Sequence, residues 1–392
     1  MEKAPLSMRK HIAILGNTNA GKSSLFNGLL GQALAIVSDV KGTTTDPVTK
    51  AMELIGYGPV AIIDTAGLGD KSILGEKRME KTKNILNRCD LAIIAEDILS
   101  SESFEIDLGR IPCIKVFTKC DLADTKLLEE KKRQNPDRIF LSGYTDEALF
   151  ELKQKMIEML KKQSADTETL LGNILNSGDK VVFVIPIDSA APAGRLILPQ
   201  VQAIRDCLDN GIISTCVTPE NLKAALEAAP DTKLVVTDSQ AFKEVSELVP
   251  QNIQLTSFSM LLANQKGRIT QLIDGTSAIK GLKDGDKILM LEACTHITTH
   301  EDIGKVKIPA LLQKVTGKKL EFTHKAGYDF PADIEEYALV IQCGGCMINK
   351  REILSRLDIL AEKGIPVTNY GVVLAYLNGI LERASVVFEN LK

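Results

Sequence analysis

Short apolar runs alternate with longer amphipathic stretches in the first part of the chain. Five β-rich runs lie between residues 11 and 164, namely HIAILG, VAIIDTAG, LAIIAE, CIKVFTKCD and RIFLSG. The stretches between them carry the apolar spacing of helices. Strands that alternate with helices are typical of a parallel sheet with crossover helices. The pattern predicts one α/β domain over residues 1–165.

Two further alternations follow a polar connector at residues 155–178. The strand-like runs VVFVIPID, ISTCVT, KLVVTDS and IQLTSFS predict a small α/β unit over residues 166–262. The runs KILMLEAC, KLEFTH and YALVIQ, with the helix-like stretches LLANQKGRITQLIDG and IGKVKIPALLQKV, predict another over residues 263–392. The expected fold class is therefore α/β, with three domains.

Composition excludes some partners. The 392 residues carry a formal net charge of -4, so no excess of Lys and Arg draws the surface onto nucleic acid or an anionic membrane. The N-terminus lacks the apolar stretch and cleavage site of a signal peptide, and no long uncharged apolar run follows. We expect a cytoplasmic protein that binds neither nucleic acid nor membrane.

The clearest motif lies at residues 16–23, where GNTNAGKS follows a predicted strand and precedes a predicted helix. This is the P-loop pattern, in which glycines let backbone N–H groups surround phosphate oxygens. Lys22 is expected to neutralise the terminal phosphates, and the Ser23 hydroxyl to bind magnesium. The other residues expected to bind the nucleotide here are Gly16, Gly21 and Ser24.

Two more segments complete a phosphate and magnesium site. Asp64 ends a strand in the sequence DTAG, so its carboxylate can hold magnesium through water, while the Gly67 amide faces the terminal phosphate. A threonine of the run GTTTD, in the expected switch loop, can complete the magnesium shell, and Thr44 is our choice. Lys22, Thr44 and Gly67 are the expected catalytic group.

A base-binding motif favours guanine. Lys119 and Asp121 belong to TKCD after the strand CIKVF, and an Asp there accepts from the ring N–H and the exocyclic amine of guanine. Adenine lacks this pair of donors, so GTP is favoured over ATP. Ser142 and Gly143, after the strand IFL, are expected to form the last base-contacting loop.

The segments NTNAGKSSLFN, GTTTD and DTAG resemble the translation-factor-like GTPases that include the tRNA-modifying TrmE proteins. In that group the asparagine that matches Asn19 helps to bind a potassium ion in place of an arginine finger. The resemblance implies potassium-stimulated GTP hydrolysis. It leaves the catalytic acid open, because the register of Glu76 against the catalytic Glu of that group is undefined. Slow intrinsic turnover is expected.

Three of the eight cysteines have suggestive spacing. Cys294 and His296 form a Cys-x-His after one predicted strand, and Cys343 and Cys346 form a Cys-x-x-Cys after another. A lone Cys-x-x-Cys is compatible with a redox disulfide, whereas the added Cys-x-His favours a metal. The residues by themselves leave zinc and an iron–sulfur cluster as alternatives.

The two cysteine motifs downstream of the GTPase motifs resemble the cluster domain of the FeFe-hydrogenase maturation GTPases, the HydF family. Segments such as VIPIDSAAPAGRLILPQVQAIRDCLD and VTNYGVVLAYLNGILERA extend the resemblance over nearly the whole chain. It implies a 4Fe-4S cluster held by Cys294, Cys343 and Cys346. Gln342 stands where many members have His, which leaves the fourth ligand open. Glu301 is our first choice and His296 the second; other candidates are His300, Asp302 and His324.

The family resemblance also implies a role and partners. Such a protein would use GTP, Mg2+ and K+, receive a diiron precursor from the radical-SAM maturases HydE and HydG, and deliver it to apo FeFe-hydrogenase. The expected organisation is a P-loop GTPase domain followed by a dimerisation domain at 166–262 and a cluster domain, in a homodimer. The alternative is a TrmE-like tRNA- or ribosome-modifying GTPase with a structural metal site.

Overall fold

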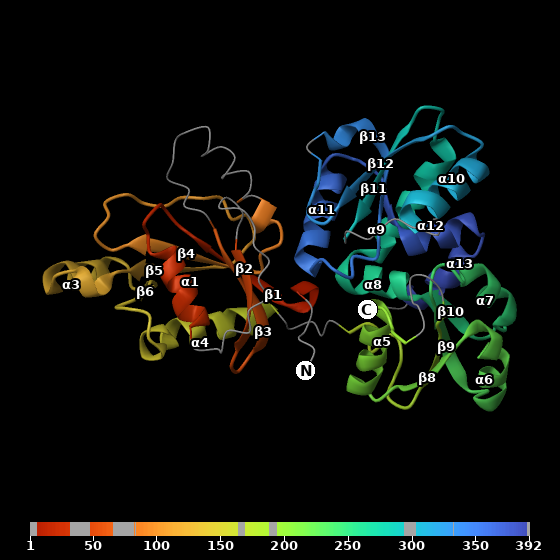
Figure 1. Ribbon diagram of the computed structural model, residues 1–392, viewed down its shortest axis with the longest axis horizontal. Helices are drawn as coiled ribbons and strands as arrows, with labels where there is room; N and C mark the ends of the chain where they lie inside the picture. The colour runs from red at the N-terminus through yellow and green to blue at the C-terminus, as the bar shows by residue number, and fades with distance from the viewer. Residues whose placement is uncertain are drawn as a thin grey trace. The chain divides into compact units, whose positions relative to one another are not determined.

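A computed structural model gives the fold of two compact units, residues Met1–Thr167 and Glu168–Lys392. Figure 1 labels their helices and strands. The division of the second unit into two domains stays a prediction. The residues that the structure describes are 6–31, 48–65, 82, 84–163, 169–187, 194–293, 303–331 and 333–389.

The first unit contains a six-stranded sheet of order β2-β3-β1-β4-β5-β6. All neighbouring strands are parallel except β2 and β3, which are antiparallel. The strands are β1 (Lys10–Leu15), β2 (Val48–Leu54), β3 (Gly58–Asp64), β4 (Leu91–Asp97), β5 (Cys113–Thr118) and β6 (Ile139–Phe140).

Helices cover this sheet because its central strands are apolar on both faces. The α-helices of the unit that the structure describes over their full length are α1 (Lys22–Leu30), α3 (Thr125–Gln134) and α4 (Asp146–Gln163). Apolar residues of α1 and α4 share one buried cluster with β1, β3 and β4. The five strands predicted from the sequence are all present. The antiparallel strand β2 was not predicted, because its exposed outer positions interrupt the apolar pattern.

The second unit contains two four-stranded sheets, both entirely parallel. Their orders are β10-β9-β7-β8 and β12-β11-β13-β14, so each sheet places its first and third strands side by side at the centre. The strands are β7 (Lys180–Val184), β8 (Ile213–Val217), β9 (Thr232–Thr237), β10 (Gln254–Ser257), β11 (Lys287–Glu292), β12 (Glu321–Ala326), β13 (Tyr337–Gln342) and β14 (Val367–Asn369).

The helices of this unit differ from the sequence prediction in two places. The stretch predicted as one helix before β11 breaks at Gly267, where an added Cβ would lie 2.9 Å from the Ala263 carbonyl oxygen. Residues Ile303–Lys307 form a π-helix ahead of α10. The α-helices are α5 (Leu198–Asp209), α6 (Leu222–Ala228), α7 (Phe242–Leu248), α8 (Phe258–Lys266), α9 (Ile269–Asp274), α10 (Ile308–Thr316), α11 (Lys350–Glu362), α12 (Tyr370–Leu377) and α13 (Leu381–Ser385).

One apolar cluster runs through both halves of the second unit. It joins residues of β7 and β9 to residues of β11 and β13. Helix α8 lies between the two sheets and packs against α5 as well as α11 and α12. The shared core explains why the segment after residue 168 packs as a single compact unit.

Candidate functional sites

The phosphate loop between β1 and α1 requires glycine at two positions. Gly16 has a φ of 149°, and a Cβ there would lie 2.1 Å from the Ala95 carbonyl oxygen. Gly21 has a φ of 78°, and its Cβ would lie 2.8 Å from the Tyr144 hydroxyl oxygen. Because the backbone passes so close to its neighbours, side chains are excluded and the N–H groups at the start of α1 remain available to an anion.

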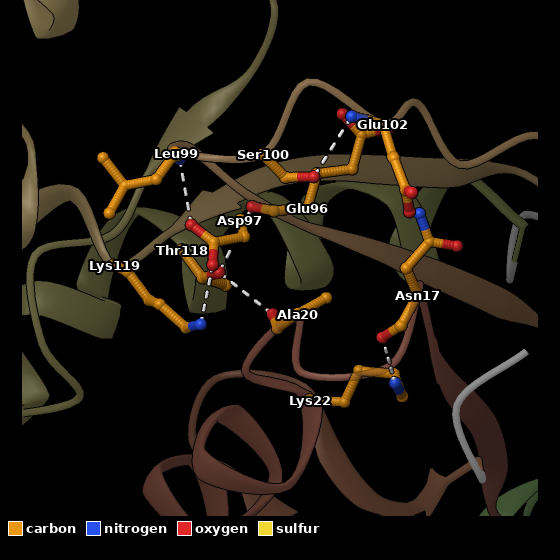
Figure 2. A network of polar contacts seen from close by, with 10 residues as sticks. All are labelled: Asn17, Ala20, Lys22, Glu96, Asp97, Leu99, Ser100, Glu102, Thr118 and Lys119. Carbon is orange, nitrogen blue, oxygen red and sulfur yellow. Dashed lines mark hydrogen bonds and ion pairs between the residues drawn. The ribbon is translucent and has the colours of Figure 1, made fainter. Parts of the chain in front are cut away.

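Lys22 is held inside this loop. Its side chain is buried, and its Nζ donates to the Asn17 carbonyl oxygen at 2.6 Å (Figure 2). Burial lowers the pKa of Lys22, while the charge of Asp64 opposes that shift. The ammonium is therefore positioned by the loop and poorly solvated, which increases the benefit of a phosphate partner.

Asp64 and Ser23 form the expected magnesium pair. The Ser23 hydroxyl donates to Asp64 Oδ2 at 2.9 Å, although the two residues are 41 positions apart. Asp64 Oδ1 is buried and has no hydrogen-bond partner among the described residues. Burial raises the pKa of Asp64, while Ser23 and Lys22 lower it. An unpartnered carboxylate oxygen beside a hydroxyl fits a hydrated Mg2+ ion, which takes oxygen ligands.

The end of β5 ties the guanine motif to the phosphate loop. The Thr118 hydroxyl lies 2.9 Å from the Ala20 carbonyl oxygen and 3.2 Å from that of Glu96 (Figure 2). Lys119 has a φ of 58° and its ammonium contacts Asp97 Oδ2 at 2.6 Å. Asp121 is exposed directly after this turn. One threonine thus sets the distance between the base-reading segment and the phosphate cradle.

Sequence reasoning missed Asp97, Glu96 and Tyr144. Asp97 pairs with Lys119, and Glu96 pairs with Arg138. The sequence did contain a signal for the two acids, because Glu96 and Asp97 end the predicted strand β4, which lies beside the strand of the guanine motif. Burial, and then the charge of Asp121, raises the pKa of the Tyr144 hydroxyl, which lies behind the P-loop.

The other predicted nucleotide residues lie in exposed or open positions or outside the described residues. Asn19 is exposed with a φ of 64°, and Ser24 is exposed on α1. Ser142 is exposed, and Gly143 has a φ of 89° with open space around its Cβ position. Thr44 and Gly67 lie outside the described residues, as does Glu76.

The cysteine motif lies at the carboxyl edge of the second sheet of the second unit. After β11 the chain passes to β12 on one side and then to β13 on the other, so β11 and β13 flank a topological switch point. Ligands of parallel sheets bind at such points. Cys343 directly follows β13, and its sulfur accepts from the Ala293 N–H at 3.1 Å and the Gly345 N–H at 3.4 Å. Ala293 directly precedes Cys294.

Only part of the predicted metal set is described. Cys343 and Cys346 are both partly buried, and burial raises the pKa of the Cys343 thiol. His324 lies in β12, where it pairs in register with Met290. Within the described ranges there is no group of three or more His, Cys, Asp or Glu side chains that could hold a metal ion. The remaining candidate ligands lie outside those ranges: Cys294, His296, His300, Glu301 and Asp302.

Both compact units match models of known protein families. Residues 11–136 match the model of the 50S ribosome-binding GTPase family. Residues 170–267 match the hydrogen maturase F dimerization domain, and residues 270–387 match the hydrogen maturase F tetramerization domain. The last two together span more than half of the chain. The chain belongs to the hydrogen maturase F family.

The first unit also has relatives outside this family. The tRNA modification GTPase MnmE of Chromobacterium violaceum is 36% identical over 168 residues, which are 41% of this chain and 37% of that protein. MnmE of Helicobacter pylori strain J99 is 35% identical over 175 residues, 42% of this chain and 38% of that protein. The chain thus spans less than two fifths of these relatives. The solved G domain of the T. maritima FeoB iron transporter is 25% identical, with a TM-score of 0.29, and matches 39% of this chain and 99% of that domain.

These matches confirm several predictions. The chain contains a P-loop GTPase domain, and its fold class is α/β. The GTPase domain carries with it GTP and Mg2+ as ligands, and the hydrogen maturase F domains confirm the predicted family. No helix in the described part of the chain has the length and apolar character needed to cross a membrane.

Proposed function

We propose that this hydrogen maturase F protein is a GTPase and iron–sulfur scaffold that helps to assemble the diiron subcluster and deliver it to FeFe-hydrogenase. The observation that carries the proposal is the 3.1 Å contact between Cys343 Sγ and the N–H of Ala293, the residue before Cys294. It brings Cys343 to the residue that precedes Cys294, at one end of one sheet, although the two residues in contact are 50 positions apart in the sequence.

The GTPase arm uses the phosphate site of the first unit. Lys22 would bind the terminal phosphates, and Ser23, Asp64 and Thr44 would hold Mg2+ directly or through water, which neutralises charge that develops during phosphoryl transfer. Gly67 would donate its amide to the terminal phosphate, and Asp121 would select guanine. Switch-segment conformations that differ between the GTP and GDP states would bias association with partners.

The scaffold arm uses the cysteine turn of the second unit. Cys294, Cys343 and Cys346 would hold a 4Fe-4S cluster through three thiolates. Glu301, or else His296, would be a weaker fourth ligand, and a bound cluster of this kind would offer an exchangeable iron position. Thiolates suit this cluster, and because burial raises the pKa of the Cys343 thiol, binding of the cluster would have to displace a proton from it.

Partner roles follow the same proposal. The diiron precursor would be cargo that the radical-SAM maturases HydE and HydG supply and that this protein transfers to apo FeFe-hydrogenase.

Elemental analysis of anaerobically purified protein, with electron paramagnetic resonance, tests whether the protein binds an iron–sulfur cluster. We expect about four irons and four sulfides per chain, because a 4Fe-4S cluster has that composition. Stoichiometric zinc without sulfide would contradict the proposal.

Self-association is expected to use the edge of the first sheet of the second unit. Strand β8 is an edge strand, and Ile213 on it is 51% exposed. On α5, Leu208 is 70% and Val201 47% exposed. Exposed apolar side chains on one edge strand and one helix fit a homodimer interface within residues 166–262. Light scattering of the full chain should show a dimer or tetramer, and Leu208→Asp should lower the mass, whereas Leu248→Asp on α7 should not.

Potassium is proposed as an activator of hydrolysis. Asn19 is exposed in the phosphate loop in a left-handed conformation, so its side chain is free to face a cation near the phosphates. Turnover in potassium should exceed turnover in sodium, and Asn19→Ala should remove the difference. Equal rates in both salts for the unaltered protein would dismiss this role.

The identity with MnmE over 168 residues favours a second candidate, a GTPase that acts on tRNA or the ribosome. This candidate predicts that the protein retains RNA at physiological salt, with affinity that falls as salt rises. RNA recovered from a pull-down with the full chain, together with absence of iron, would support it over the scaffold.

A further inference from the structure

A buried lysine lies against the cysteine turn. Lys266 ends α8 and is only 5% exposed. Its Nζ donates to the carbonyl oxygens of Gly345 and Ile348, each at 3.0 Å. These two carbonyls flank Cys346 along the chain. A single ammonium therefore spans the backbone segment that presents the second thiol of the Cys-x-x-Cys motif.

The turn is otherwise held by close packing. Gly345 has a φ of 67°, and a Cβ there would lie 2.5 Å from Ile353 Cδ1 on α11. On its other side, a Cβ on Gly344 would lie 3.4 Å from Ser259 Oγ on α8. The Ile348 N–H also donates to the Gly345 carbonyl oxygen at 3.3 Å. Helices α8 and α11 thus enclose the turn, and Lys266 is the charged group that α8 adds to it.

We propose that Lys266 is a positioning residue of the cysteine turn that also supplies positive charge to the metal centre bound there. This inference rests on the proposed function, because it takes Cys343 and Cys346 as ligands of an iron–sulfur cluster. Lys266 would fix the direction of the Cys346 backbone through Gly345 and Ile348. It lies in the dimerization segment, 170–267, and so connects that segment to the cysteines of the next one.

The charge has a defined effect on an anionic cluster. Three thiolates make the cluster site negative, and reduction adds one further electron. A buried ammonium stabilises the reduced state more than the oxidised one, and a low local dielectric strengthens this interaction. Removal of the charge should therefore lower the reduction potential. Removal of the two hydrogen bonds should loosen the turn and speed the loss of iron.

Two substitutions separate these effects. Lys266→Gln removes the charge and keeps an N–H donor, whereas Lys266→Met removes both and keeps the length of the side chain. Lys287→Met is a matched control, because Lys287 begins β11 at the opposite edge of the sheet and is ion-paired to Glu336. The measurements are the midpoint potential of the reconstituted cluster, followed by electron paramagnetic resonance, and the rate of iron transfer to a chelator.

We expect both Lys266 variants to shift to a lower potential than the unaltered protein, and Lys266→Met to lose iron severalfold faster than Lys266→Gln. The control should behave as the unaltered protein in both assays. Unchanged potentials in the Lys266 variants would overturn the charge role, and equal iron loss in Lys266→Met and the unaltered protein would overturn the positioning role. If Lys266→Met does not fold, Lys266→Gln alone still decides the potential. A cluster in the unaltered protein with no shift in the variants defeats this inference alone, whereas absence of a cluster there defeats the proposed function as well.

Discussion

The phosphate loop and the cysteine turn are built in different ways. The phosphate loop is contiguous, and its residues 16–23 contain the backbone donors, the lysine and the serine of the site. The proposed cysteine site depends on the position of β13 beside β11, which brings Cys343 to Ala293. Backbone N–H groups bind an anion at the start of a helix by local geometry alone. A site built from two distant segments requires the packing of a whole sheet.

The buried lysines of the two sites also differ in what they contact. Lys22 is held by one carbonyl oxygen of its own loop, that of Asn17. Lys266 belongs to a helix remote in sequence and donates to two carbonyl oxygens of the cysteine turn. In our proposals the first lysine would be a ligand of the substrate. The second would hold the backbone that carries the cysteines, so its loss should weaken a property of the centre without abolishing it.

The largest expected effect tests whether the nucleotide site is self-sufficient. Lys22→Ala removes the charge aimed at the terminal phosphates, and GTP turnover should fall by about 10²- to 10³-fold or more, as when one preorganised donor is lost. Iron content should be unchanged, because the cysteines belong to the other compact unit. Steady-state turnover and iron analysis measure both. Lys115→Ala, an exposed lysine on β5, is the control and should leave turnover intact.

The base-reading residue gives the next effect. Asp121→Asn places a donor opposite the donors of guanine, and GTP affinity should fall by about 10²-fold or more, since two charge-assisted hydrogen bonds are lost. Xanthosine triphosphate should gain affinity, because its carbonyl oxygen accepts where guanine donates. Fluorescent nucleotide titration checks both. Asp124→Asn, which changes the cap of α3 instead, should keep the guanine preference.

The cysteine variants test whether the cysteine turn binds iron independently of the nucleotide site. Cys343→Ser should lose most of the iron, because a hydroxyl is a far poorer ligand for iron–sulfur iron than a thiolate. GTP turnover should stay near that of the unaltered protein. Cys216→Ser alters an exposed cysteine on β8 and should keep the iron. Equal iron in both variants would remove Cys343 from the ligand set.

Two neighbouring glycines of the turn differ in backbone angle and in the room for a side chain. Gly345→Ala places a side chain at a φ of 67° and 2.5 Å from Ile353 Cδ1, so strain and overlap together should lower the free energy of unfolding of the metal-free protein by more than about 1–2 kcal/mol. Gly344 has room for a Cβ at ordinary contact distance from Ser259, so Gly344→Ala should change it by less than about 0.5 kcal/mol. Chemical denaturation measures both values. If Gly344→Ala lowered the free energy of unfolding more than Gly345→Ala does, the described packing of the turn would be wrong.

The smallest effect concerns the magnesium carboxylate without its metal. Because burial raises the pKa of Asp64, the folded chain binds that proton more tightly than the unfolded chain does. The resulting stability is present below the ordinary pKa of the carboxyl and is lost as pH rises through the raised pKa. Asp64→Asn should therefore melt higher than the unaltered protein at pH 7 in chelator. Its advantage should shrink as pH falls through that window, and an advantage independent of pH would contradict this origin.

The sequence by itself determined the parts that depend on local pattern. Apolar runs with β-branched residues placed the five parallel strands of the first sheet, and the glycines of residues 16–23 defined a loop that only glycine backbones can form. It did not reveal β2 or β14, because an exposed edge strand and a strand of three residues carry too little apolar pattern.

Only the tertiary structure decided which distant groups meet. Thr118 joins Ala20 across 98 positions, Ala293 joins Cys343 across 50, and Lys266 joins Gly345 across 79. None of these contacts has a sequence period, because each results from the order of strands in a sheet and from the helices packed on it. The sharing of one core by two predicted domains has the same cause, since α8 is apolar toward both sheets at once. Local sequence sets the conformation of each segment, and packing alone sets which segments become neighbours.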